Sequence, residues 1–389
     1  MARANGAHGY RAVLSAPRMA LNGTVIRTGT IAILLCSVIL CVFTYLAVLA
    51  DPSIPLLFAW RKLRLFPWLA DLRLNPVGTF VQTTGKAIAG LVLLYSTGAQ
   101  VKTLFRHAKG DVSFSAHEAW HSGRANSHAL VTAIALLILV ATGTLLSALA
   151  LGLPGRIPVA GEIFAGFGFL LALPLVFLLL VCLALIAGTL TVGVAIANTL
   201  DDDWLGTLVN VGALLWSQWW RFLVYEGIVF CITIASWLAA TGLLFTCTGL
   251  AIVLVGLTTQ GRLAAVAYVA SQFVPGLDWV LSRVVPQFDV WSIVVGPGVA
   301  VGGAFVSFGI LFLLAVVTGY AAGVWSAGQM ATYAELRRHQ YSQDIFEKED
   351  MIDRVAALAP TLKSGRHEAG VIAPSGERKD AGDQKPPAS

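Results

Sequence analysis

The segment His117-Glu118-Ala119-Trp120-His121 carries the strongest chemical signal in the chain. It matches the pattern H-E-x-x-H, in which two histidines one helical turn apart can share a zinc ion. The glutamate of such a motif activates the metal-bound water as a general base. This interpretation makes His117 and His121 metal ligands, Glu118 the catalytic base and the protein a zinc metalloprotease.

The surrounding residues weaken this interpretation. A catalytic zinc needs a third protein ligand, and the extended motif would place a glycine and a histidine where Arg124 and Ser127 stand. The acidic run 201–203 could supply a ligand, but nothing in the sequence requires it. The alternative is an amphipathic helix over about 113–122 that lies along the lipid headgroups with its histidines facing water. We favour this alternative, and it assigns no catalytic, cofactor-binding or metal residue.

The apolar runs that flank this segment define the class of protein. Hydrophobic residues make up 57% of the 389 residues and charged residues only 12%, against about 25% charged in a soluble domain. A run of about 20 apolar residues spans a bilayer as a helix. The sequence therefore predicts an all-α polytopic transmembrane bundle with interfacial amphipathic helices and about six spans, within a range of five to eight. The spans are predicted near 28–50, 78–100, 128–151, 165–195, 222–254 and 298–325.

The fourth and fifth spans are longer than a bilayer requires. Pro174 or Gly188 could kink the fourth or split it into a hairpin, and Gly242 or Gly249 could do so in the fifth.

Composition outside the spans predicts the remaining organisation. The segments are a basic cytoplasmic leader (1–27), the transmembrane domain (28–325), a cytoplasmic amphipathic segment (326–359) and a disordered tail (360–389). With six spans, 18 of the 26 Lys and Arg residues fall on the side of the two termini. The positive-inside rule therefore places both termini in the cytoplasm.

Two ionisable residues, Lys86 and Glu226, fall within spans, where burial of a charge is costly and often functional. Their expected depths differ by about 12 Å, so we do not expect a direct pair. Glu226 is expected to reach cations at headgroup level. Lys86, with Gln82, Thr83 and Thr84, gives the second span a polar face that could line a transport path.

Short motifs over about 80–350 resemble a family of uncharacterised bacterial multi-pass membrane proteins. This family is similar to the membrane domain of glycerophosphodiester phosphodiesterases. The matching pieces are Glu118-Ala119, the loop 155–163, the block 218–225 and the segment 333–338 with the acidic residues after it. In the block, Gln218 and Trp219 replace the arginine and proline of the family. The resemblance implies a helix-surface role for Glu118 and brings no catalytic residues.

These observations predict a bacterial inner-membrane protein with a non-enzymatic role as a scaffold, an assembly factor or a lipid-associated module. The expected partners are the lipid bilayer and other membrane proteins, and nucleic acid is not expected. The alternatives are a membrane zinc metalloprotease, with zinc as its cofactor, and a small-molecule transporter.

Overall fold

The computed structural model describes residues 10–56, 74–111, 114–153, 160–200, 203–258, 262–274 and 297–341. This part of the chain forms ten helices and no strand. Six of the helices are long and apolar enough to cross a membrane. The predicted all-α bundle with six spans is therefore confirmed. Residues 1–345 make up one compact unit, and residues 346–389 form a second unit that lies outside the described residues.

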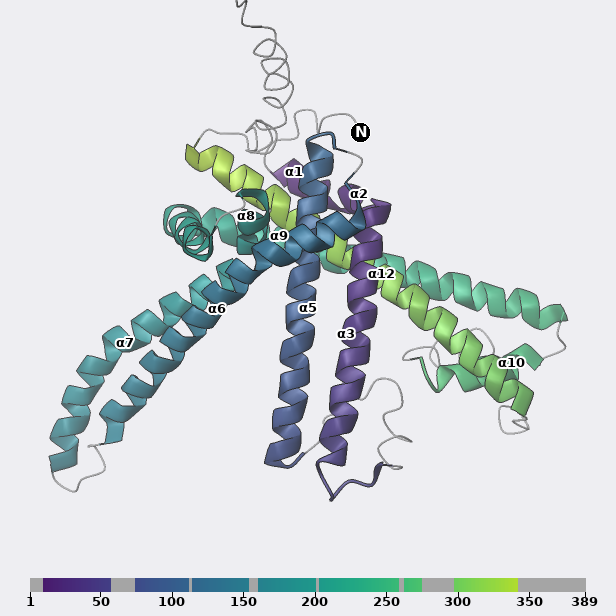
Figure 1. The fold of residues 1–389 in the computed structure, drawn as a ribbon, viewed down its shortest axis with the longest axis horizontal. Helices are drawn as coiled ribbons and strands as arrows, with labels where there is room; N and C mark the ends of the chain where they lie inside the picture. The colour runs from purple at the N-terminus through teal and green to yellow at the C-terminus, as the bar shows by residue number, and fades with distance from the viewer. Residues whose placement is uncertain are drawn as a thin grey trace, which may run out of the picture. The chain divides into compact units, whose positions relative to one another are not determined.

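The helices follow one another in antiparallel hairpins (Figure 1). Helix α3 packs against α5, α6 packs against α7, and α12 packs against both α9 and α10. Three short helices, α1, α2 and α8, also pack against α12. The bounds are α1 Tyr10–Leu14, α2 Ala16–Ala20, α3 Gly23–Leu49, α5 Pro76–Ala108, α6 Ala116–Gly152, α7 Ala160–Leu190, α8 Val192–Leu200, α9 Trp204–Thr258, α10 Arg262–Ser271 and α12 Pro297–Tyr341.

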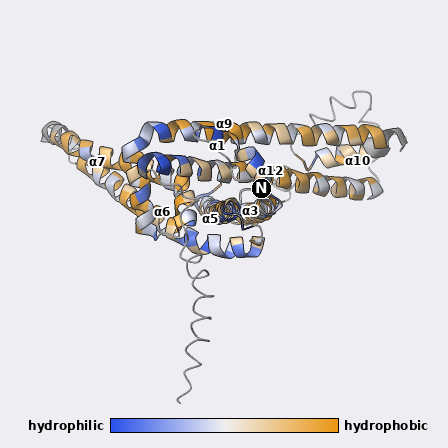
Figure 2. Ribbon diagram, turned by 90° about the horizontal axis from the view of Figure 1, so that it is seen from above, coloured by the Kyte–Doolittle hydropathy of each residue, from blue (hydrophilic) through white to orange (hydrophobic). Residues whose placement is uncertain are grey.

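Burial is concentrated in three helical stretches that we call the junction: residues 96–105 of α5, 192–199 of α8 and 321–336 of α12. Almost every residue in these stretches is buried, whereas the apolar part of α7 is mostly exposed. Figure 2 shows hydrophobic colours along α7 and hydrophilic residues gathered where the helices converge near α1. A membrane helix can leave apolar side chains in lipid, so the exposed apolar surface of α7 is consistent with a lipid environment, whereas the junction is packed on all sides.

The third span begins earlier than predicted. Helix α6 starts at Ala116 and runs without interruption into the membrane-spanning stretch, so no separate interfacial helix covers the described part of 113–122. The physical reason is the capping box of Ser115 and Glu118, with no proline between it and residue 128. Ala119, Gly123 and Ser127 are buried on this first part of α6. Residues 58–68 and 277–285, whose mixtures of aromatic, apolar and charged side chains also favour interfacial segments, lie outside the described residues.

The helical backbone of the long spans is interrupted at residues other than those predicted. Helix α7 continues through Pro174, and the break comes at Thr191, where α8 follows. Helix α9 stays helical through Gly242 and Gly249 but turns at Gln218, whose φ of −140° and ψ of 31° are not helical.

Two predicted segment boundaries also fall inside helices. Helix α12 continues through the boundary at 326 to Tyr341, and α3 begins at Gly23, within the predicted leader. The remainder of 326–359 and all of 360–389 lie outside the described residues. Hydropathy marks where the apolar stretch stops, whereas these helices extend into less apolar sequence.

Helices α3 and α12 cross with their backbones in contact at two glycines. A Cβ atom on Gly319 would lie 2.5 Å from the backbone nitrogen of Thr30 and 2.9 Å from the carbonyl carbon of Gly29. A Cβ atom on Gly29 would lie 2.6 Å from the carbonyl oxygen of Gly319. Small residues let membrane helices approach this closely, and here both partners must be glycine.

Replacing Gly319 by alanine is expected to destabilise the protein by about 1–3 kcal/mol, because the added methyl group overpacks the crossing of α3 and α12. Gly309→Ala is the matched control on the same helix, since a Cβ atom there would meet nothing within 4 Å. It should be neutral or slightly stabilising. Thermal unfolding of both variants in detergent measures the difference, and equal stabilities would contradict this account of the crossing.

The turn between α3 and α5 is closed by two side chains. Asn75 caps α5, its Oδ1 accepting from the backbone N–H of Gly78 at 2.7 Å, and its Nδ2 donates to the carbonyl of Ala50 at 3.0 Å. Asp51 accepts from the backbone N–H of Asn75 at 2.8 Å and from the Ser53 hydroxyl at 2.6 Å. Hydrogen bonds from the Ser53 hydroxyl, the Asn75 backbone and the Ser53 backbone lower the pKa of Asp51.

Stability should therefore fall as the pH is lowered through the pKa of folded Asp51. The folded-state pKa lies below the unfolded one, so the stabilisation is present above the ordinary carboxyl range and disappears as the folded carboxylate takes up a proton. Unfolding of wild type and Asp51→Asn at neutral and at acidic pH measures this, and the gap between the two proteins should shrink in acid. Ser53→Ala should give an intermediate pH dependence. A gap that does not change with pH would contradict the role given to Asp51.

Candidate functional site

The H-E-x-x-H residues lie on the first turns of α6. His117, Glu118 and His121 are exposed. The hydroxyl of Ser115 accepts from the backbone N–H of Glu118 at 3.3 Å, and the Glu118 carboxylate accepts from the backbone N–H of Ser115 at 2.9 Å. This reciprocal pair is a capping box, which satisfies two backbone donors at the start of the helix.

A third zinc ligand is not brought to these histidines by the described part of the chain. No group of three or more His, Cys, Asp and Glu side chains there could hold a metal ion. Of the acidic run, Asp203 is described and residues 201–202 lie outside. The zinc site on His117 and His121 stays a prediction, and the contacts of Glu118 give it a structural role in helix initiation.

The polar face of the second span is satisfied mainly within its own helix. Lys86 is exposed, and its Nζ lies 3.4 Å from the Oε1 of Gln82. The hydroxyls of Thr83 and Thr84 donate to backbone carbonyls one turn earlier, at 2.8 and 2.9 Å. These bonds use the single donor of each hydroxyl and leave its acceptor lone pairs.

Glu226 contacts a neutral partner on another helix. Its Oε2 accepts from Nε2 of Gln329 on α12 at 2.8 Å. The described residues contain no ion pair to this carboxylate, either with Lys86 or with a cation at headgroup level. Among the described residues, Glu226 therefore bonds α9 to α12 and pairs with no cation.

A second buried contact joins α3, α5 and α12. The amide of Gln100 donates to the carbonyl of Val25 at 3.2 Å, and the hydroxyl of Ser326 donates to the amide oxygen of Gln100 at 2.7 Å. Both Gln100 and Ser326 are fully buried. Polar side chains in this position hold helices together where lipid offers no alternative hydrogen-bond partner.

Helices α5, α6 and α8 meet around Gly98. A Cβ atom on Gly98 would lie 2.4 Å from the hydroxyl oxygen of Ser127 and 2.9 Å from Nδ2 of Asn198. Asn198 donates to the carbonyl of Val194 at 2.9 Å. Ser127 and Asn198 are fully buried, so Gly98 is needed to seat two polar side chains beside the α5 backbone.

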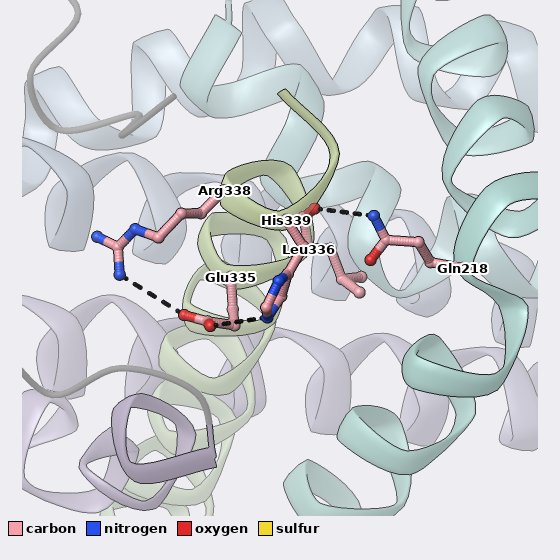
Figure 3. A network of polar contacts seen from close by, with 5 residues as sticks. All are labelled: Gln218, Glu335, Leu336, Arg338 and His339. Atoms are coloured by element: carbon pink, nitrogen blue, oxygen red, sulfur yellow. Dashed lines mark hydrogen bonds and ion pairs between the residues drawn. The ribbon is translucent and has the colours of Figure 1, made fainter. Parts of the chain in front are cut away.

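The end of α12 is held to the bend in α9 (Figure 3). Nε2 of Gln218 donates to the carbonyl of Leu336 at 3.4 Å. Next to Leu336, the buried carboxylate of Glu335 lies 3.3 Å from Nε2 of His339 and 3.7 Å from the guanidinium of Arg338, both about one turn further along α12. Because the backbone of Gln218 is not helical, its side chain can reach the backbone of α12.

Sequence reasoning missed most of these contacts. Gln100, Ser326, Gln329 and Asn198 were not identified, because each falls close to or beyond an expected span end. A usable signal was present in α12, where small residues recur every fourth position. These are Ala315, Gly319, Gly323, Ala327 and Ala331, and all five are buried.

Several buried polar groups in and beside the junction therefore bond one helix to another. Those of Gln100, Ser326 and Gln329 connect four different helices, and Glu118 initiates a fifth. Their chemistry is that of hydrogen-bonded cross-links within a membrane bundle.

Comparison of the chain with protein-family models, with curated proteins and with solved structures finds no match. The resemblance to bacterial multi-pass membrane proteins thus stays a prediction that rests on its short motifs. The hydrogen bonds within the molecule are the remaining guide to its function. They describe a multi-pass helical membrane protein in which several buried polar side chains connect different helices.

Proposed function

We propose that this protein is a non-enzymatic integral membrane module that acts as a scaffold, an assembly factor or a lipid-associated protein. The observation that carries the proposal is the use of the buried polar side chains. Gln100 with Ser326, and Glu226 with Gln329, bond one helix to another. Glu118 caps its own helix, so its carboxylate has a structural use.

The exposed apolar side chains of the long helices support the same proposal. Helix α7 presents large side chains such as Phe169 and Phe177 to its surroundings, with 65% and 67% of their surfaces exposed. Such surfaces suit lipid chains or the apolar spans of other membrane proteins. An internal transport path would instead require polar side chains that line a route between helices.

A bacterial inner-membrane location with both termini in the cytoplasm is part of the proposal. Val13 of α1 packs against Ala331 of α12, which supports a position of the two described ends on the same side. The distribution of Lys and Arg over the whole sequence supports a cytoplasmic position for that side. Eighteen of the 26 fall in segments assigned to the side of the termini, seven in the loops assigned to the other side, and Lys86 within a span.

The orientation can be tested with cysteines placed at opposite ends of the first hairpin. In a chain without its five native cysteines, Ala108→Cys should react with an impermeant maleimide only in inverted vesicles. Leu56→Cys, just past α3, should react only from outside. Both positions are exposed. The reverse pattern would contradict the cytoplasmic assignment.

The functional proposal is tested on the purified full chain. In lipid particles taken directly from the membrane, the chain should co-purify with a membrane protein or a lipid in constant ratio. Zinc content should be the same in wild type and in the His117→Ala/His121→Ala variant. In proteoliposomes, Lys86→Leu should leave solute flux unchanged.

Two results would overturn the proposal. About one zinc per chain, lost in the double variant, would favour the metalloprotease, with Glu118→Gln as the activity control. A flux abolished by Lys86→Leu would favour the transporter.

A further inference from the structure

The side chains of Glu226 and Gln329 share one hydrogen bond, and each has an oxygen atom with no hydrogen-bond partner. Nε2 of Gln329 donates to Oε2 of Glu226 at 2.8 Å. The remaining oxygen of each side chain, Oε1 of Glu226 and Oε1 of Gln329, is buried and has no hydrogen-bond partner among the described residues. Buried polar atoms are nearly always paired, so two such atoms on bonded side chains need an explanation.

An ionised Glu226 gives no explanation. A carboxylate only accepts hydrogen bonds, and the amide oxygen of Gln329 also only accepts. Oε1 of Glu226 and Oε1 of Gln329 therefore both remain without a hydrogen-bond donor. The carboxylate charge would also be held at a partly buried position between helices. Burying a charge without a paired cation is costly in a membrane protein.

One proton removes both deficits. We propose that Glu226 binds a proton on Oε1 in the folded protein and forms a two-bonded acid–amide pair with Gln329. The carboxyl O–H donates to Oε1 of Gln329, and Nε2 of Gln329 donates to Oε2 of Glu226. The site takes up a hydrogen ion, with no other ligand and no bond cleavage. This inference is independent of the proposed function.

The immediate surroundings of the pair are neutral. Gln329 faces Glu226 from α12. The Thr191 hydroxyl, in the turn between α7 and α8, also lies beside the carboxyl group as a neutral hydrogen-bonding neighbour. Its proton is directed to the carbonyls of Ala187 and Gly188, at 3.1 and 3.3 Å, so it does not satisfy Oε1 of Glu226. Titratable groups also occur on α9 and on the elements packed against it. None of these groups makes a hydrogen bond or ion pair to Glu226 in the described structure. The groups are Arg221 and Tyr225 on α9, Tyr333, Glu335 and His339 on α12, Tyr10 and Arg11 on α1, Arg18 on α2, His121 and Arg124 on α6, Cys182 on α7 and Tyr268 on α10.

Proton binding by the folded state has a defined effect on stability. Above the ordinary carboxyl range, unfolding releases the proton, so the folded state binds one more proton than the unfolded state. Stability then falls as the pH rises, by about tenfold in the folding equilibrium constant per pH unit. The fall stops once Glu226 loses its proton in the folded state as well.

Infrared spectroscopy of the full chain in lipid nanodiscs tests the proposal. At neutral pH, the difference between wild type and Glu226→Gln should contain the carbonyl band of a protonated carboxylic acid, present in wild type only. Glu118→Gln is the matched control. Its carboxylate is exposed, so its difference spectrum should show the loss of carboxylate bands only. A Glu226→Gln spectrum that loses carboxylate bands would overturn the proposal.

Two further measurements keep the test sound if Glu226→Gln folds poorly. Gln329→Leu retains the acid but removes its partner, so the protonated-carboxyl band should shift; an unchanged band would overturn the proposal. The second measurement is the stability against denaturation between neutral and alkaline pH. Glu226→Gln, whose amide can keep both hydrogen bonds, should lose the wild-type fall in stability. An identical pH dependence in wild type and variant would count against the site.

Discussion

Close contact between the backbones of α3 and α12 is the constraint on which the junction depends. Gly29 and Gly319 leave no room for a side chain between the two helices. Because the helices touch here, Gln100 on α5 can bond to Val25 on α3 and to Ser326 on α12 at the same time. A methyl group at either glycine would separate these partners as well as the backbones.

The junction shows how a membrane protein can be held together although helices such as α7 bury few apolar side chains. Lipid chains are as apolar as leucine side chains, so moving a leucine from lipid to protein yields little free energy. Close packing of small residues and hydrogen bonds between helices must contribute more. These features gather at Gly98, Gly319 and Gln100, whereas the exposed side chains of α7 can be left to lipid or to a partner.

Hydropathy was sufficient to predict the fold class and all six spans, including the polar second span that carries Lys86. It could not locate the ends of α6 and α12, because helices continue past the apolar stretch when capping or packing supports them. The role of Glu118 was also hidden, since the same glutamate suits a zinc motif and a capping box. The partner of Glu226 depends on which helices α12 crosses, and no local pattern contains that information.

Helix α12 has 45 residues and is therefore about 68 Å long at 1.5 Å per residue. A hydrocarbon core of about 30 Å is less than half that length. The helix must cross at a slant, extend into water, or do both. A slanted helix adapts to a change in bilayer thickness by changing its angle, at a modest energetic cost. Since Gly319 and Gln329 lie on this helix, a change in its slant would act directly on the contacts that α3 and α9 make with it.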